Sequence, residues 1–284
     1  MNISSEAPAR PVCRYHGGKF RLRGWVISHF SDHRVYVEPF GGGASVLMAK
    51  PRSYAEVYND LDGEIVNLFR VLRDHGGELT EKIRLTPFAR AEFDMAYLPS
   101  DDPMEQARRT LVRSGMGFGS SGTSSSIKTG FRGSATRSGT HPAMDWKRQA
   151  DNLAAVTERL AGVIIENRDA VTVMTYHDSP TTLHYVDPPY VHSTRTWLKK
   201  GSKEAYRHEM TDDDHRRMAD VLRGLKGKVI LSGYSSSLYD DLFGDWHQVQ
   251  KEALADGAAK RTECLWLNAA AVAGMRNLFS EVAP

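Results

Sequence analysis

The chain has 284 residues, 40% of them hydrophobic, which is enough to bury a core as one large domain or as one domain with an insertion. It has no apolar run long enough to cross a bilayer, its first residues lack the layout of a signal peptide, and two distant cysteines, Cys13 and Cys264, exclude a cysteine-based zinc ribbon. The net charge of +2 excludes no class of protein by itself. Because the sequence shows no membrane span, no signal-peptide layout and only two cysteines, we expect a soluble protein of the reducing cytoplasm with no membrane partner.

Short apolar runs of strand length alternate with helical patterns. The runs are Arg34–Glu38, Tyr54–Tyr58, Gly162–Glu166, Thr182–Val186 and Lys228–Ser232, and a last strand, Arg261–Leu267, is predicted to form a hairpin with Trp246–Val249. Apolar residues recur at helical spacing from Ile65 to Leu72 and from Met218 to Leu225, and Thr211–Asp214 is predicted to cap the second of these helices. This alternation predicts an α/β fold with a mostly parallel, doubly wound sheet.

Ligands of such sheets bind at the carboxyl ends of the strands. After the first strand, Glu38-Pro39-Phe40-Gly41-Gly42-Gly43-Ala44-Ser45 forms a glycine turn followed by a helical Val46–Met48. Glycines let a ligand approach the backbone closely, but a simple tight turn fits the pattern equally well.

Two further segments combine polar or aromatic residues with positions suited to a ligand. Tyr15-His16-Gly17-Gly18-Lys19 precedes a helical pattern that begins at Leu22, and it is either a binding segment or a solvated loop. Asp60 ends the second strand, where it is placed to accept hydrogen bonds from ribose hydroxyls. Alternatively, Asp60 or Asp62 caps the helix that begins near Gly63.

A Gly- and Ser-rich region with clustered basic residues interrupts the pattern. Between residues 108 and 150, eight basic residues accompany a single acid, Asp145, so this stretch carries +7 and the rest of the chain about −5. The basic residues are Arg108, Arg109, Arg113, Lys128, Arg132, Arg137, Lys147 and Arg148. With Phe118 and Phe131 between them, these residues favour either a nucleic-acid contact or a mobile, solvated linker.

The fourth segment, Asp187-Pro188-Pro189-Tyr190, directly follows the strand Thr182–Val186. It is either a loop or an active site. Together, the four segments, in the order in which the chain carries them, resemble the Dam-type DNA adenine methyltransferases of class alpha, which use S-adenosylmethionine. The resemblance continues through Leu231–Tyr239 and Arg261–Asn268 and covers almost the whole chain except the recognition region.

This resemblance implies a Rossmann-like methyltransferase sheet with an inserted, mainly helical target-recognition domain. We expect residues 1–85 to form the cofactor-binding half, 86–150 the recognition insert and 151–284 the catalytic half. Residues implied in cofactor binding are Tyr15, Lys19, Glu38, Pro39, Phe40, Gly41, Gly42, Asp60 and Asp187. Tyr15-His16 replaces the commoner Trp-Ala, and Ala44 stands where glycine is usual, so we assign Ala44 to the scaffold.

The resemblance also implies chemistry for the fourth segment. The exocyclic amine of adenine is a poor nucleophile, and the Asp187 carboxylate and the Pro188 carbonyl can each accept one of its hydrogens. Tyr190 would stack on an adenine flipped out of double-stranded DNA. Candidate DNA contacts are Arg113, Lys128, Arg132 and Arg137.

No histidine pair has a zinc-helix spacing with a partnering Glu, so we expect no metal. We expect a monomer from a bacterium or phage, and whether it has a cognate restriction enzyme stays open. Two alternatives also stay open: a methyltransferase acting on RNA adenine, and a catalytically silent DNA-binding subunit. A protein amide acceptor is disfavoured, because Asp rather than Asn opens the fourth segment.

Overall fold

The computed structural model describes residues 1–125, 127–134, 141–195, 206–254 and 260–280. Seven strands form one sheet in the order β3-β2-β1-β4-β5-β7-β6. The strands are β1 (Val35–Glu38), β2 (Ala55–Asn59), β3 (Val163–Glu166), β4 (Thr182–Val186), β5 (Lys228–Gly233), β6 (His247–Leu254) and β7 (Lys260–Leu267). β1 to β5 run parallel, and the β6–β7 hairpin joins β5 in antiparallel pairing. The predicted strands, the hairpin and the mostly parallel sheet are therefore confirmed.

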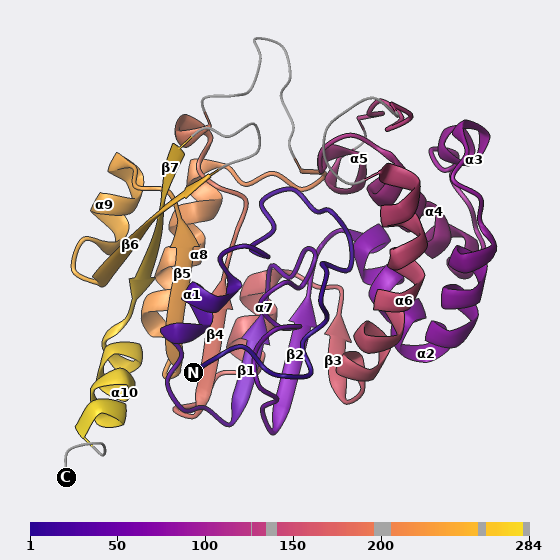
Figure 1. Ribbon diagram of the computed structural model, residues 1–284. Coiled ribbons are helices and arrows are strands. Elements are labelled where there is room, and N and C mark those ends of the chain that lie inside the picture. The colour runs from indigo at the N-terminus through magenta and orange to yellow at the C-terminus, as the bar shows by residue number, and fades with distance from the viewer. Residues whose placement is uncertain (126, 135–140, 196–205, 255–259, 281–284) are drawn as a thin grey trace.

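Helices cover both faces of this sheet, as Figure 1 shows. They are α1 (Arg23–Ser28), α2 (Gly63–Leu85), α3 (Arg90–Met95), α4 (Pro103–Met116), α5 (Ser121–Ser124), α6 (Pro142–Leu160), α7 (Ala170–Tyr176), α8 (Asp212–Gly224), α9 (Ser237–Phe243) and α10 (Ala269–Ser280), with a 3₁₀ turn, η1, at His192–Thr194. None of the helices in the described ranges is both long enough and apolar enough to cross a membrane.

Alternate side chains of each strand enter different cores, as the two-residue period of a strand requires. Tyr36 and Tyr185 pack in the core that includes side chains of α1 and α2. Val186 and Leu231 point the other way, into the core formed with α7, α8 and α9. Burial on both faces explains why β4 and β5 are apolar along nearly their whole length in the sequence.

The structure also shows which of the predicted residues cap the helices. Thr211 and Asp214 form a reciprocal capping box at the start of α8, as predicted. Asp62 caps α2 by accepting from the backbone N–H of Glu64 at 3.0 Å. This leaves Asp60, the other candidate for the cap, free for a different role.

The predicted helix at Val46–Met48 is wrong, because the segment forms only hydrogen-bonded turns. The Leu47 N–H is taken by the Glu38 carboxylate at 2.9 Å, and Lys50 turns inward to the Glu56 carboxylate. The bond to Glu38 occupies a backbone N–H that a longer helix would pair with a carbonyl of the preceding turn.

Helices α3 to α6 form most of the region between α2 and β3. α4 and α6 pack on α2, and buried side chains such as Leu111 and Leu153 belong to the same core as Tyr36 of β1. The Trp146 indole N–H donates to the Thr86 carbonyl at 2.8 Å and ties α6 to the end of α2. The residue-150 boundary falls inside α6, and the division into three domains stays a prediction.

Candidate active site

The strand order reverses between β1 and β4. From β1 the chain continues to β2 and β3 on one side, and from β4 it continues to β5 on the other. Glu38 is the last residue of β1, and Asp187 follows β4. Such a switch point opens a crevice at the carboxyl ends of the two strands, so Glu38 and Asp187 lie where a ligand is expected.

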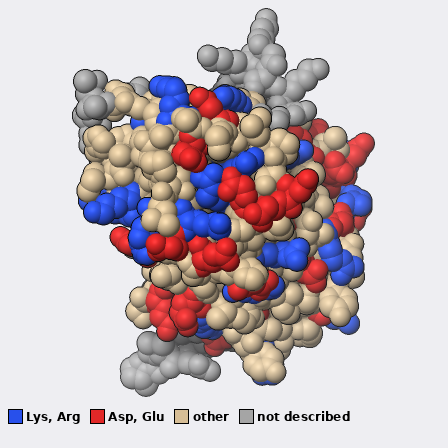
Figure 2. All heavy atoms as spheres, turned by 90° about the vertical axis from the view of Figure 1, so that its right-hand side faces the viewer, with Lys and Arg blue, Asp and Glu red and all other residues tan. Residues whose placement is uncertain are grey.

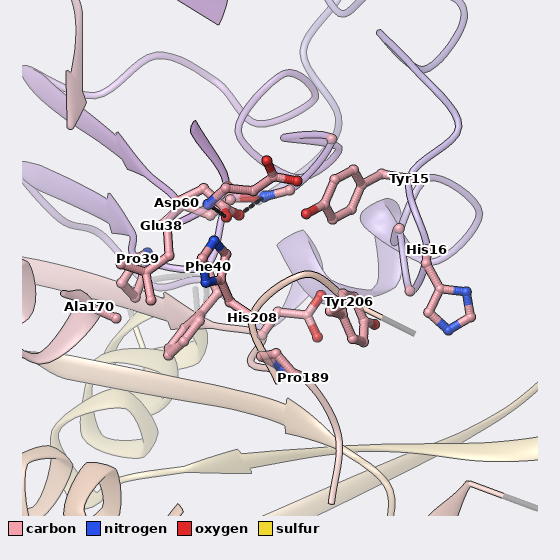
Figure 3. Close-up of a pocket in the computed structure, with 18 of the residues that line it drawn as sticks. Tyr15, His16, Glu38, Pro39, Phe40, Asp60, Ala170, Pro189, Tyr206 and His208 are labelled. Carbon is pink, nitrogen blue, oxygen red and sulfur yellow. Dashed lines mark hydrogen bonds between the residues drawn. The ribbon is translucent and has the colours of Figure 1, made fainter. Parts of the chain in front are cut away.

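A pocket occupies this crevice and encloses about 820 Å³ of space, including the solvent at its mouth. Figure 3 shows Tyr15 and Tyr206 across the cavity from Glu38, Phe40 and Asp60. The lining includes all the residues predicted to bind a cofactor: Tyr15, Lys19, Glu38, Pro39, Phe40, Gly41, Gly42, Asp60 and Asp187.

The glycine turn leaves space for two aromatic rings, those of Tyr58 and Tyr15. A Cβ atom on Gly41 would lie 2.1 Å from the Tyr58 ring, and one on Gly42 would lie 2.8 Å from the Tyr15 ring. Gly42 also has a φ of +44°, and its carbonyl accepts from the Tyr58 hydroxyl at 2.8 Å. The glycines are therefore required by the packing of the protein itself, and not only by the approach of a ligand. Ala44 has a φ of +51°, is fully buried and lies outside the pocket lining.

Asp60 is partly buried and lines the pocket. Its Oδ2 accepts from the Gly42 N–H and its Oδ1 from the Asp62 N–H, each at 2.8 Å. Burial raises the pKa of Asp60 to about 6, although these two hydrogen bonds act in the opposite direction. Each carboxylate oxygen can still accept a second hydrogen bond, as from a hydroxyl group in the pocket.

Glu38 is buried more deeply. Its Oε2 accepts from the Tyr36 hydroxyl at 2.7 Å and from the Leu47 N–H at 2.9 Å. Burial raises the pKa of Glu38 to about 8; the hydrogen bond from Tyr36 opposes the rise, and the nearby charge of Asp187 adds to it. A cation in the pocket would favour the ionised form of both carboxyls.

Lys19 and Asp187 form an ion pair on the wall of the pocket. The Lys19 ammonium is almost fully buried and donates to the Gly17 carbonyl at 2.8 Å. It lies 2.9 Å from each oxygen of Asp187, but only its contact with Oδ2 has hydrogen-bond geometry. Oδ1 of Asp187 is therefore a buried acceptor without a hydrogen-bond donor among the described residues.

The other members of the fourth segment lie differently. Pro189 lines the pocket, whereas Pro188 is buried and Tyr190 lies beside the pocket. The Tyr190 hydroxyl donates to Glu263 of β7 at 2.8 Å, and the Lys19 ammonium lies 4.8 Å from the centre of its ring. Of the three residues predicted to be catalytic, only Asp187 directly lines the cavity.

Several lining residues were not predicted from the sequence. Ala170 begins α7 just beyond the end of β3, so the rule of strand ends would have pointed to it. Tyr206, His208, Glu209 and Met210 also line the pocket, and no sequence motif marked them.

Arg207 fastens this 206–210 segment to the start of α2. Its guanidinium donates to the Asp62 carboxylate at 2.6 Å and to the Glu64 carboxylate at 3.0 Å, both at the start of α2. Its backbone N–H donates to the Ser124 carbonyl of α5 at 2.9 Å. The segment thus connects the pocket with the helical region that precedes α6.

The basic stretch is largely neutralised by acids of the chain itself. Arg108 and Arg109 pair with Glu105, and Arg108 also pairs with Glu92. Lys128 pairs with Asp94 at 2.8 Å. Figure 2 shows acidic and basic side chains side by side on the face at the α2, α4 and α6 side of the molecule.

The four residues predicted to contact DNA differ in exposure. Arg113 is buried, binds the Glu64 carboxylate and donates to the Ala96 carbonyl, so it does not present its charge to a partner in this conformation. Arg132 is 15% exposed and faces Asp145, whereas Lys128 is 54% exposed. Arg137 lies outside the described residues.

Metal ligation finds no support within the described ranges, where no three His, Cys, Asp or Glu side chains group as they would around an ion. Both cysteines are buried and free.

Comparison with known proteins adds to this geometry. A family model described as "D12 class N6 adenine-specific DNA methyltransferase" matches residues 15–256 and confirms the predicted resemblance. The Type II methyltransferase M1.LlaDCHI of Lactococcus lactis subsp. cremoris is 26% identical over 274 residues, which cover 88% of this chain and 90% of that protein. The family match spans the pocket and most of the sheet, so the chain belongs to the D12 class of N6 adenine-specific DNA methyltransferases.

Proposed function

We propose that this enzyme takes its methyl group from S-adenosylmethionine in the Glu38–Asp60–Asp187 pocket and transfers it to an adenine flipped out of double-stranded DNA. Site-specific methylation of adenine N6 in DNA is the reaction of the family, which requires a methyl donor. Membership of this family argues against the two alternatives, an RNA substrate and a silent subunit.

The residues that line the pocket suit this donor in charge and in hydrogen-bonding capacity. When bound, S-adenosylmethionine supplies an electrophilic methyl group on a positively charged sulfur. Glu38 and Asp187 provide negative charge for a cationic ligand, and Asp60 retains lone pairs for ribose hydroxyls. Tyr15 offers a flat ring on the opposite wall.

Oδ1 of Asp187 lies in the ion pair with Lys19 but accepts no hydrogen bond from the described residues, and this observation carries the proposal. Lys19 holds the carboxylate through Oδ2, so Oδ1 is available to accept a hydrogen from the adenine amine. The Pro188 carbonyl is proposed to accept the other hydrogen, and the two prolines fix the backbone that carries both acceptors. Both bonds draw the amine lone pair onto nitrogen, where it can attack the methyl carbon.

The amine of a stacked base pair is out of reach of these acceptors, so we include base flipping in the proposal. Its cost is on the order of a few kcal/mol, which stacking on Tyr190 partly offsets.

DNA contacts are proposed for the exposed basic residues of the helical region. Lys128, Lys147 and Arg148 are exposed. Arg137 stays a candidate, whereas Arg113 and Arg132 are better explained by their bonds within the protein. The named relative is a type II methyltransferase, which supports a modification role for this chain, with a cognate restriction enzyme as partner. We propose that the enzyme acts as a monomer. The DNA of a bacterial cell lies in its cytoplasm and nucleoid, and we propose that the methylation takes place there.

Long-read sequencing of DNA from cells that express the protein tests the proposal. The wild type should methylate adenine within a restricted sequence, and Asp187→Ala should abolish the signal. Asp241→Ala, which changes an exposed carboxylate of α9, is the matched control and should methylate like the wild type. Retained methylation in a folded Asp187→Ala protein would remove the role given to Oδ1.

A further inference from the structure

Glu263 of β7 is a buried carboxylate with no part in the chemistry described so far. Its exposed fraction is 8%, and it lies beyond residue 256, where the family match ends. An isolated ionised carboxylate is costly to bury, so its partners indicate what it does. Those partners are hydroxyl groups at the edge of the active site.

The strongest of these contacts is with Tyr190. The Tyr190 hydroxyl donates to Oε2 of Glu263 at 2.8 Å, and the Ser232 Oγ of β5 lies 3.2 Å from the same hydroxyl. A hydrogen bond to a charged group is stronger than one between neutral groups. Because β5 and β7 are paired strands, the tip of the Tyr190 side chain is attached to the rigid sheet.

Tyr234 completes this arrangement. Its ring packs edge-to-face with Tyr190 at a centroid distance of 4.7 Å. Burial raises the pKa of Tyr234, and the nearby carboxylate of Glu263 raises it further, so this carboxylate acts on both phenols. The Lys19 ammonium, 4.8 Å from the centre of the Tyr190 ring, links the pair to Asp187.

The backbone beside Tyr190 does not fix the ring by itself. Tyr190 is partly exposed and is followed by Val191 and the 3₁₀ turn η1, so the torsions of its side chain need a restraint at the far end. A stacking surface contributes to catalysis only when it is held in the productive orientation. The hydroxyl contact with Glu263 is such a restraint.

We propose that Glu263 is a positioning residue, which holds the Tyr190 ring by its hydroxyl so that the target adenine stacks at the correct angle beside Asp187. This inference rests on the proposed function, and it gives a role to the two C-terminal motifs, Leu231–Tyr239 and Arg261–Asn268. It also explains why a phenol rather than a phenyl ring stands at position 190.

Three substitutions test the assignment. Glu263→Ala removes the acceptor and Tyr190→Phe removes the donor, so each should lower kcat about tenfold, as loss of one charge-assisted hydrogen bond allows. Glu263→Gln keeps a side-chain oxygen at nearly the same place and should stay within about threefold of the wild type. The double variant Tyr190→Phe with Glu263→Ala should be no slower than the slower single variant, because both remove the same bond.

Two readouts separate positioning from general damage. Affinity for S-adenosylmethionine, measured by calorimetry, should be unchanged in all variants because Glu263 does not line the pocket. The fluorescence of 2-aminopurine placed at the target adenine reports unstacking, and its intensity or lifetime should change in Glu263→Ala and Tyr190→Phe alike.

Wild-type kcat in a folded Glu263→Ala protein would overturn the inference, and so would multiplication of the two single effects in the double variant. A loss shared by Glu263→Gln and accompanied by weaker cofactor binding would instead assign Glu263 to general stability. In each of these cases methylation by the wild type still supports the proposed function. Absence of adenine methylation by the wild type would overturn both.

Discussion

Glu38 should make the stability of the ligand-free protein depend on pH. The carboxyl is 3% exposed, and burial raises its pKa from the ordinary 4.5 to about 8. Between these values the unfolded chain has released the proton that the folded protein still holds. The stabilisation is therefore complete below pH 4.5 and is lost as the pH rises through about 8.

The substitution Glu38→Gln isolates this contribution, because glutamine resembles the protonated carboxyl and does not titrate. Burial also lowers the pKa of His33, His184 and His215 to about 4, but these groups titrate identically in both proteins. At about 1.4 kcal/mol per pH unit, the wild type should lose on the order of 3 to 4 kcal/mol relative to Glu38→Gln between pH 5 and 8.

Urea denaturation of both proteins across this pH range is the assay, with the free energy of unfolding extrapolated to water. At pH 5 the two proteins should have similar stability, and at pH 8 the variant should be the more stable one. If the two stabilities change in parallel with pH, Glu38 is already ionised in the folded protein and the reasoning fails.

Two other substitutions test contacts away from Asp187, the carboxylate that we propose to be catalytic. Arg207→Met removes the ion pairs with Asp62 and Glu64 that hold the 206–210 segment beside the pocket. It should weaken binding of S-adenosylmethionine about five- to tenfold in calorimetry, with kcat near normal at saturating donor. Unchanged affinity would mean that the 206–210 segment keeps its place without Arg207. Arg159→Met deprives the buried Glu56 of two hydrogen bonds and should lower the free energy of unfolding by about 3 to 5 kcal/mol. The exposed Arg216→Ala is its control and should stay within roughly 0.5 kcal/mol of the wild type, so a similar small loss in Arg159→Met would contradict the role of the buried pair.

The sheet was predictable because burial on both faces leaves a direct mark on the sequence. The predicted strand Thr182–Val186 coincides with β4, and the other predicted strands overlap theirs. The turn at Val46–Met48 was mispredicted for the opposite reason. Its backbone is fixed by Glu38, a residue of the preceding strand, and local apolar spacing carries no information about that bond.

The pocket residues separate in the same way. Tyr15, Glu38 and Asp60 were predictable because they stand at strand ends or in a motif with a known family pattern. Tyr206 and Met210 were not, because the position of their segment depends on ion pairs between Arg207 and the distant start of α2. No composition or periodicity near residue 207 reports those partners.

The basic stretch shows how a count of charges can mislead. The +7 of residues 108–150 was summed without Glu64, Glu92 and Asp94, which lie earlier in the chain and pair with Arg113, Arg108 and Lys128. Charge becomes a surface property only after folding has brought partners together. The exposed Lys147 and Arg148 are therefore better guides to a polyanion than the total.

The site as a whole opposes the stability of the ligand-free protein. Glu38 and Glu263 are buried and Asp60 is partly buried, and burial raises the pKa of each carboxyl. Lys19 compensates only part of this negative charge, because its ammonium is bound to Asp187. A sulfonium donor would supply the missing positive charge and lower these pKa values, so the features that destabilise the empty pocket are those that favour a cationic ligand.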